Sequence, residues 1–323
     1  MTRVICGVDV SSLSLDARIG RDGVFASFPN TAEGIVKLAR FCREQRVELV
    51  AMEATGGYEQ QAMALLSAEN LGVAIVNPCA VRRFAQSMGL LEKTDKIDAG
   101  AIAWYAEVKR ASTITLPSAT QQHLRALVTR LRQLTDLHTA QRNQQRLITD
   151  STVQGCFHAL LALVKRQIEE LAREIAALIE ADPLWRELNH AFRTIKGVAD
   201  RTVARLMAEM PEIGTLSNKT ISKLAGLAPL ANDSGKHQGQ RVVRGGRAAV
   251  RDILFLVGSV VARHEADFSE FQQRLRGAGK PPKVVRIAVA HKLLVRLNAK
   301  AREVRQQLSR PTPSQPLTAT MAS

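Results

Sequence analysis

The sequence is poor in aromatic residues and contains no long apolar run. Aromatic residues make up 4% of the chain, so stacking of nucleic-acid bases on an aromatic platform is not expected to be the main binding mode. The longest apolar run, Ile253 to Ala262, is shorter than the about 20 residues that a membrane-spanning helix requires. No basic-then-apolar segment precedes a small-residue cleavage site at the N-terminus. We therefore expect neither a membrane protein nor a secreted one.

Cysteine usage excludes two further kinds of site. The four cysteines stand far apart, at Cys6, Cys42, Cys79 and Cys156, without a CxxC or histidine-spaced pairing. This spacing indicates neither a zinc site nor a disulfide framework. We expect a reduced, cytoplasmic protein with a well-developed core, because 46% of its residues are hydrophobic and that fraction is ordinary for a globular protein.

Charge, in contrast, is abundant and unevenly distributed. The net charge is +15, yet residues 1–110 hold 13 basic and 13 acidic side chains and are neutral in total. Residues 231–310 hold 17 basic and 6 acidic side chains, a net charge of +11. Such a concentration indicates contacts with the phosphates of a nucleic acid. A basic surface that serves only solubility is the alternative interpretation.

Apolar runs and helical periodicity alternate over the first hundred residues, as they do in an α/β domain. The predicted strands cover Val4–Val10, Leu15–Ile19, Val24–Phe28, Glu48–Met52 and Val73–Val76. The predicted helices cover Thr31–Gln45, Gly57 to about Asn70, and Ala80 to about Met88. This order indicates a mixed sheet with helices on its faces, in a domain of residues 1–117.

Two further segments are predicted behind this domain. Residues 118–182 are almost free of glycine and proline and carry leucines at helical spacing. They predict two antiparallel amphipathic helices with a break near Gly155, which form a spacer or a dimer seam. Residues 183–310 form a basic, mainly helical segment in which 226–246 is rich in turn residues and reads as a loop. Residues 311–323 are expected to be disordered.

The basic segment contains the candidate nucleic-acid ligands. The stretch Ile195 to Met210 resembles a helix-hairpin-helix turn, whose amides around Gly197 bind a DNA phosphate. A plain turn between two helices explains Gly197 equally well. The residues predicted to contact nucleic acid are Lys196, Gly197, Lys236, Arg241, Arg244, Arg247 and Arg251.

Four carboxylates are predicted to meet in the first domain. Asp9 ends the first strand and Glu53 the fourth, and these strands are often neighbours in a mixed sheet. Asp95 and Asp98 lie three residues apart at the start of a helix and share a face. Each acid alone has an ordinary structural explanation, such as a negative charge at a helix N-terminus. Together they predict a Mg²⁺ site for phosphodiester chemistry, since Mg²⁺ prefers carboxylate oxygens.

The order of these motifs resembles the insertion sequence 110 family of DEDD transposases, which includes bridge-RNA-guided recombinases. The resemblance runs from about residue 4 to about residue 300 and rests on "GVDVS", "MEATGGYE", "VNP", "KTDKIDA" and "LAGLAPLANDSGKHQGQRVVRGGRAAVR". It implies a RuvC-like, ribonuclease-H-type domain, whose acidic tetrad falls on Asp9, Glu53, Asp95 and Asp98. It also implies a mainly α-helical C-terminal transposase domain, whose serine nucleophile matches Ser234.

The resemblance further implies a DNA transposase or recombinase that excises and inserts an insertion sequence through a covalent phosphoserine at a composite site. The implied cofactor is Mg²⁺, and the implied partners are element-end and target DNA, an element-encoded guide RNA, and further copies of the chain in a dimer or tetramer. From the residues alone, a serine before a glycine is ordinary turn chemistry, and no histidine and aspartate complete a triad with Ser234. Two alternatives stay open. They are a RuvC-type Holliday-junction resolvase that uses metal-activated water, and a non-catalytic nucleic-acid-binding scaffold.

Overall fold

The computed structural model divides the chain into two compact units. The units cover Met1–Pro117 and Ser118–Ser323. The residues that the structure describes are 3–90, 94–231, 233–234, 237–239 and 241–310, without the side chains of residues 95, 96, 237 and 238. The tail for which disorder is expected, 311–323, lies outside the described residues.

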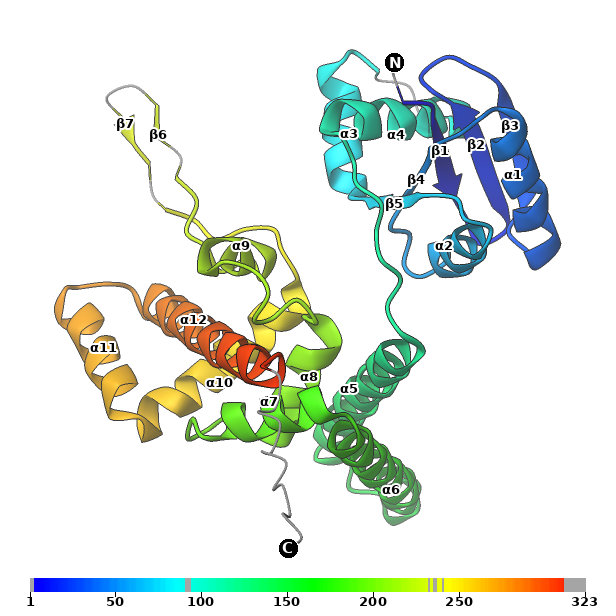
Figure 1. The fold of residues 1–323 in the computed structure, drawn as a ribbon. Helices are drawn as coiled ribbons and strands as arrows, with labels where there is room; N and C mark the ends of the chain where they lie inside the picture. The colour runs from blue at the N-terminus through cyan, green and yellow to red at the C-terminus, as the bar shows by residue number, and fades with distance from the viewer. Residues whose placement is uncertain (1–2, 91–93, 232, 235–236, 240, 311–323) are drawn as a thin grey trace, which may run out of the picture. The chain divides into compact units, whose positions relative to one another are not determined.

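A mixed five-stranded sheet forms the centre of the first unit, with the strand order β3-β2-β1-β4-β5 (Figure 1). Strand β1 pairs antiparallel with β2, and β2 antiparallel with β3. Strand β4 runs parallel to β1, and β5 parallel to β4. The strands cover Ile5–Val10 (β1), Ser14–Ile19 (β2), Phe25–Pro29 (β3), Leu49–Glu53 (β4) and Val73–Val76 (β5). The predicted mixed sheet, with its first and fourth strands side by side, is confirmed.

Helices cover both faces of this sheet, because side chains alternate between the faces along each strand. The helices α1 and α2 pack on the face that carries Val8 and Met52. The helices α3 and α4 pack on the face that carries Leu49 and Ala51. These helices cover Ala32–Glu44 (α1), Glu59–Ala68 (α2), Pro78–Ser87 (α3) and Asp95–Lys109 (α4).

Polar caps determine where three of these helices begin. The side chains of Thr31, Asn77 and Thr94 each accept a hydrogen bond from the backbone N–H three residues later, at 3.1 to 3.3 Å. Such caps satisfy donors that the first helical turn leaves free. The start of α4 after Thr94 places Asp95 and Asp98 in the first turn of that helix.

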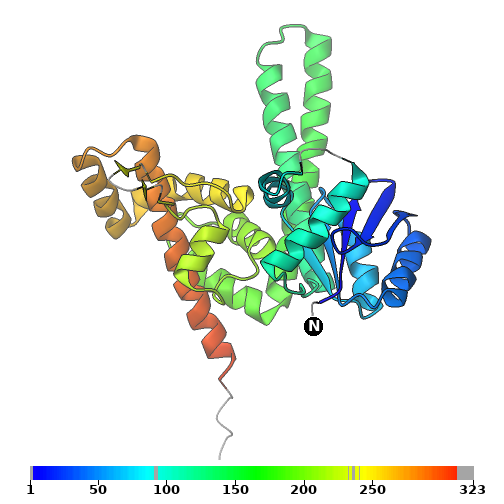
Figure 2. The same cartoon turned by 90° about the horizontal axis from the view of Figure 1, so that it is seen from above.

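The second unit opens with the long helices α5 (Ala119–Gln145) and α6 (Ser151–Ala181), which pack side by side and project from the rest of this unit (Figure 2). The predicted break near Gly155 is wrong, since Gly155 lies inside α6. The chain turns before Ser151 because Asp150 accepts the N–H of Val153 at 2.9 Å and so caps the new helix. A glycine within a helix costs only about 1 kcal/mol relative to alanine, which this hairpin tolerates.

The remaining helices form a body that shares one hydrophobic core with α5 and α6. Leu124 of α5, Phe192 of α7 and Leu293 of α12 all lie in this core and are fully buried. The helices of the body cover Pro183–Arg193 (α7), Asp200–Glu209 (α8), Asn218–Leu224 (α9), Ala248–His264 (α10), Ala266–Gly277 (α11) and Pro282–Leu308 (α12). Among the residues that the structure describes, none of the helices combines the length and the apolar character that a membrane span requires.

The segment predicted as a loop, 226–246, contains a short β-hairpin. Its strands are β6 (Asp233–Ser234) and β7 (His237–Gln238), which pair antiparallel. In Figure 1 this hairpin extends away from α9 and from the helices around it. We call residues 226–246 the serine loop.

Candidate active site

Three acidic residues approach the same edge of the sheet in the first unit. Val8 of β1 pairs with Met52 of β4, so the next residues, Asp9 and Glu53, are neighbours at the carboxyl ends of two parallel strands. Side chains in register on adjacent strands point to the same face. Asp9 also stands directly opposite Asp16 of the antiparallel strand β2. The register therefore aligns three acids across three adjacent strands.

Helix α4 brings Asp98 to this edge. A Cβ atom on Gly7 would lie 2.0 Å from the Ala99 carbonyl oxygen, so only glycine lets α4 rest directly on β1. The end of α4 lies at the start of β1, since Arg3 donates to the Ala111 carbonyl oxygen at 3.2 Å. The first turn of α4 consequently lies towards the end of β1, where Asp9 is. Asp98 belongs to that turn and precedes Ala99, the residue that touches β1.

The stretch "MEATGGYEQ" forms a braced loop behind Glu53. The Glu59 carboxylate accepts the N–H groups of Thr55 and Gly57 at 3.0 and 2.9 Å, and Thr55 Oγ1 donates to the Glu53 carbonyl oxygen at 3.2 Å. Gly56 and Gly57 have φ values of 68° and 114°, which favour glycine. The two glycines allow the chain to turn sharply, and Glu59 then holds the turn in place.

Asn30 connects this loop to the loop that follows β1. Its Nδ2 atom donates to the carbonyl oxygens of Ser11 at 2.8 Å and Tyr58 at 3.2 Å. Its Oδ1 atom is buried and accepts no hydrogen bond from the residues that the structure describes. The chain segments behind Asp9 and Glu53 are thus tied to each other by one side chain.

Carboxylate oxygens, the donors at the acidic edge, are the ligands that a hard divalent cation prefers. Carboxylates directly opposite each other, as Asp9 and Asp16 are, destabilise a sheet unless a positive charge or hydrogen-bond donors compensate. Asp16 is 8% exposed and accepts from Ser14 Oγ at 2.9 Å. Within the residues described, no three histidine, cysteine, aspartate or glutamate side chains come close enough to hold a metal ion. The side chain of Asp95 falls outside that description.

Ser234 lies in the second unit, at the tip of the serine loop. It is exposed on β6 and pairs with His237 of β7. Its neighbour Asp233 forms an ion pair with Arg241 at 2.9 Å, which links the two arms of the hairpin next to the serine. Lys236, predicted to contact nucleic acid, lies outside the described residues.

The arginines predicted to contact nucleic acid have different surroundings. Arg244 is exposed, and Arg241 pairs with Asp233. Arg247 instead directs its guanidinium to the Glu212 carboxylate, with two hydrogen bonds of 2.7 and 2.6 Å. Arg251 donates to the Gly245 carbonyl oxygen at 2.6 Å. Three of the four guanidinium groups are therefore engaged within the protein, and only two of these three, those of Arg247 and Arg251, contact the base of the serine loop.

The turn at Gly197 also has an internal partner. Gly197 has a φ value of 99° between α7 and α8, as a tight interhelical turn requires. The Lys196 N–H, one of the amides predicted to bind a phosphate, donates to the Glu265 carboxylate at 2.7 Å. A carboxylate of the protein thus occupies one anion-binding position of this turn.

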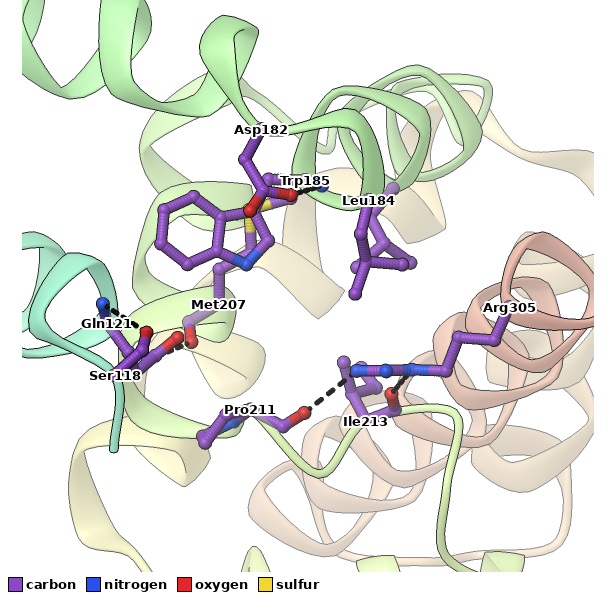
Figure 3. Close-up of a pocket in the computed structure, with 10 residues that line it drawn as sticks. Ser118, Gln121, Asp182, Leu184, Trp185, Met207, Pro211, Ile213 and Arg305 are labelled. Carbon is purple, nitrogen blue, oxygen red and sulfur yellow. Dashed lines mark hydrogen bonds between the residues drawn. The ribbon is translucent and has the colours of Figure 1, made fainter. Parts of the chain in front are cut away.

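A cavity of about 230 Å³ lies between α5, α7, α8 and α12 (Figure 3). Its polar groups serve the fold. Arg305 donates to the carbonyl oxygens of Ile213 and Pro211, both at 2.9 Å, and Gln121 donates to that of Met207 at 2.9 Å. Asp182 caps α7 by accepting the Trp185 N–H at 2.9 Å. The polar side chains that line the cavity are therefore hydrogen-bonded to neighbouring residues of the fold, and they do not converge on a common point as reactive groups would.

Sequence reasoning missed four residues that shape these sites. Asp16 lies inside a predicted strand and is placed beside Asp9 only by the strand pairing. Glu212 stands 35 residues before its partner Arg247. Asn30 and Glu59 carry no motif of their own, and their bonds depend on the folded loops.

Comparisons with known proteins relate the chain to transposases and to gene-inverting proteins. A DEDD-type family model described as "Transposase" matches residues 6–153, a range that holds Asp9, Glu53 and Asp98. A second model, "Transposase IS116/IS110/IS902 family", matches residues 189–273, a range that holds Ser234. Pilin gene-inverting proteins of Moraxella bovis and Moraxella lacunata are each 27% identical over 319 residues, covering 91% of this chain and 94% of the relative.

Solved structures of RuvC resemble a part of the chain. Thermus thermophilus RuvC in complex with a Holliday junction is 15% identical and covers 35% of this chain and 99% of its own, with a TM-score of 0.26. The structure described as "Thermus thermophilus RuvC structure" is 16% identical and covers 34% and 99%, with the same TM-score.

Proposed function

The chain belongs to the insertion sequence 110 family of transposases, and from this premise we propose that it exchanges DNA strands with an acidic divalent-cation site and a serine nucleophile. The family establishes the general activity, that of a DNA transposase or recombinase. The observation that carries the finer proposal is the strand register, which aligns Asp9 with Glu53 beneath the first turn of α4.

Asp9, Glu53, Asp95 and Asp98 would hold the cation, for which Mg²⁺ is the proposed identity. A bound divalent cation neutralises charge that develops on a phosphodiester and lowers the pKa of a hydroxyl group beside it. The protein contributes the placement of the carboxylates. Asn30 and Glu59 brace the two loops behind Asp9 and Glu53, which limits the movement of the carboxylates when substrate binds.

Ser234 would be the nucleophile. Its Oγ atom forms a bond to phosphorus while the bond from phosphorus to the oxygen of the leaving strand breaks. The hydroxyl proton ends on the leaving oxygen, directly or through water. The result is a phosphoserine ester and a free strand end, and attack by a strand end on that ester restores the serine. The exposed position of Ser234 on β6 supports this role, since a DNA backbone can reach it.

The proposed partners are element-end and target DNA together with a guide RNA. The concentration of positive charge in 231–310 supports nucleic-acid binding, because each neutralised phosphate releases counterions. Exposed Arg244 is the clearest phosphate ligand of the serine loop. We further propose that several copies of the chain assemble on the DNA, as a dimer or tetramer.

DNA inversion is a second candidate outcome of the same chemistry. The relatives in Moraxella are named for inverting a pilin gene, and their similarity spans nearly the whole chain. Inversion and transposition differ in which strand ends are rejoined and not in how the phosphodiester is opened. A plasmid with two element ends in inverted orientation, sequenced after reaction, separates inversion from excision.

Cleavage of such a plasmid tests the proposed cation site. We expect Asp9→Asn and Glu53→Gln each to reduce divalent-cation-dependent strand cleavage by more than about 100-fold. Glu33→Gln, a substitution of an exposed acid on α1, serves as the control and should leave cleavage unchanged. Full cleavage by Asp9→Asn or Glu53→Gln would refute the assignment.

A further inference from the structure

Two glycines bring the two ends of the serine loop into backbone contact. Gly226 and Gly246 have φ values of 68° and 67°. A Cβ atom on Gly226 would lie 2.1 Å from the Gly245 carbonyl oxygen, and one on Gly246 would lie 2.2 Å from the Gly226 nitrogen. Any side chain at either position would force the two segments apart. The base of the serine loop is thus closed by direct backbone packing.

Arg247 fastens this base to the helical body. Its guanidinium makes two parallel hydrogen bonds to Glu212 and a third, at 2.8 Å, to the Glu209 carbonyl oxygen at the end of α8. Its backbone N–H donates to the Leu224 carbonyl oxygen at 2.8 Å. A bidentate arginine–carboxylate pair fixes orientation as well as distance. Arg247 therefore connects α8, α9 and the start of α10 at one point.

Arg251 and a backbone bridge extend this attachment. Arg251 donates to the Gly245 carbonyl oxygen at 2.6 Å, one turn of α10 after Arg247. Further along the loop, Leu230 and Val242 exchange backbone hydrogen bonds of 3.0 and 3.3 Å. The arms of the serine loop are held together between the base and the tip.

The outer arms are largely exposed to solvent. Asp233, Ser234, Arg241 and Val242 are all exposed, so packing against the helices does not locate the tip. Ser234 lies eight residues beyond Gly226, a reach of up to about 26 Å at about 3.3 Å per residue in an extended chain. A small displacement of the backbone at the base would therefore become a displacement of the serine hydroxyl that is several times larger.

We propose that the Glu212–Arg247 ion pair, supported by Arg251, is the anchor that positions Ser234 for attack, and that these two arginines are positioning residues and not phosphate ligands. This inference rests on the proposed role of Ser234. It changes the assignment of two arginines for which the sequence predicted nucleic-acid contacts. Glu212, which belongs to none of the sequence motifs, is part of the same anchor.

The electrostatics of Glu212 support a lasting ion pair. Burial alone would raise the pKa of the Glu212 carboxyl group, yet hydrogen bonding to Arg247 keeps this pKa below its ordinary value. The carboxylate is therefore charged at neutral pH and available to hold the guanidinium. Each side chain of the pair is 35% exposed, but the Nη1 and Nη2 atoms of Arg247 already donate to the Glu212 carboxylate and the Glu209 carbonyl oxygen.

Single-turnover formation of the phosphoserine adduct on a nicked DNA substrate tests the anchor. We expect Glu212→Gln and Arg247→Lys each to slow adduct formation by about 10- to 100-fold, because small displacements of a reacting group have effects of this size. DNA affinity and its salt dependence should stay unchanged. The double variant should be no slower than the slower single variant, since both changes remove one interaction.

Hydrogen exchange provides a readout that does not depend on activity. The Leu230 and Val242 amides should exchange faster in Glu212→Gln and Arg247→Lys. Arg166→Gln removes a surface ion pair of α6 and serves as the control, with no change expected. Thermal melting confirms that each variant is folded, and Arg251→Gln replaces any variant that is not.

The outcomes separate this inference from the proposed function. A flatter salt dependence of DNA binding in Arg247→Lys, with normal adduct formation in Glu212→Gln, would make Arg247 a phosphate ligand and overturn the anchor. Unchanged adduct rates and unchanged exchange in both variants would also overturn it. Strand exchange by Ser234→Ala would refute the proposed nucleophile instead, and the exchange of Leu230 and Val242 would still test the anchor.

Discussion

Asp9 stands between two acidic neighbours, Asp16 on β2 and Glu53 on β4. Three carboxylates in register repel one another unless a cation or hydrogen-bond donors compensate. The proposed cation would add a compensating positive charge at this edge.

The proposed cation should also affect the stability of the first unit, separately from catalysis. Without divalent cations, Asp9→Asn should melt at the same temperature as the wild type or above it. Mg²⁺ at ten times its dissociation constant should stabilise the wild type by about 1.4 kcal/mol and leave Asp9→Asn unaffected. Thermal melts with and without Mg²⁺ make the comparison, with Glu33→Gln as control. Equal stabilisation of wild type and Asp9→Asn would place the cation elsewhere.

At the scale of the element, the approach of α4 to β1 is what brings Asp98 near the sheet edge. Gly7→Ala should push the first turns of α4 away, since the new Cβ atom would lie 2.0 Å from a backbone oxygen. We expect a loss of about 1–3 kcal/mol in the unfolding free energy of the first unit and a loss of strand cleavage. Denaturant unfolding followed by Trp104 fluorescence measures the first effect.

A glycine in a helix without neighbours gives the matched control for Gly7→Ala. Gly155 is exposed within α6, and a Cβ atom there would meet nothing within 4 Å. Gly155→Ala should stabilise α6 by about 0.5–1 kcal/mol and leave cleavage intact. Wild-type stability in Gly7→Ala would show that α4 does not depend on this close approach.

The contact between α9 and α12 should respond to pH. Ser222 Oγ donates to the Asn218 carbonyl oxygen at 2.6 Å and lies 2.9 Å from His291 Nε2, and burial lowers the pKa of His291 below 6.5. The unfolded chain then binds a proton more readily than the folded one. The stability that neutral His291 provides is therefore fully present above pH 6.5 and is lost as the pH falls towards the folded pKa.

His291→Gln tests this dependence, because glutamine can donate to Ser222 without titrating. The unfolding free energy of the second unit, followed by Trp185 fluorescence at pH 8 and pH 5.5, should fall more in the wild type than in His291→Gln. An equal decrease of the unfolding free energy in both proteins would show that groups other than His291 cause the pH dependence.

Particular elements show what the sequence could predict and what it could not. The strands of the first unit follow from short apolar runs, and the neighbourhood of Asp9 and Glu53 follows from the strand order. The sequence predicted the same role, a nucleic-acid contact, for Arg244 and Arg247. It could not distinguish them, because Glu212 approaches Arg247 only when α8 packs against α10. The break between the two long helices was predicted near Gly155, but it lies before Ser151. The helix cap at Asp150 determines its position, and a glycine within a helix has only a weak effect.

At the scale of the whole molecule, charge and chemistry are divided between the two units. The first unit carries the acidic edge within a segment of no net charge, and the second carries Ser234 within a basic segment. The basic segment is the part of the chain that we propose to bind DNA. Both family models are needed to cover these two sites.

Ser234 is the residue on which the proposed strand exchange depends most, and a trapped covalent adduct tests its role most directly. Protein incubated with a nicked element-end substrate and Mg²⁺, then denatured, should carry DNA on a phosphoester that peptide mass spectrometry locates at Ser234. Ser234→Ala should give no adduct and no strand exchange while binding DNA with wild-type affinity. Cleavage by Ser234→Ala with free product ends would show that water is the nucleophile, as in a resolvase, and would contradict the account.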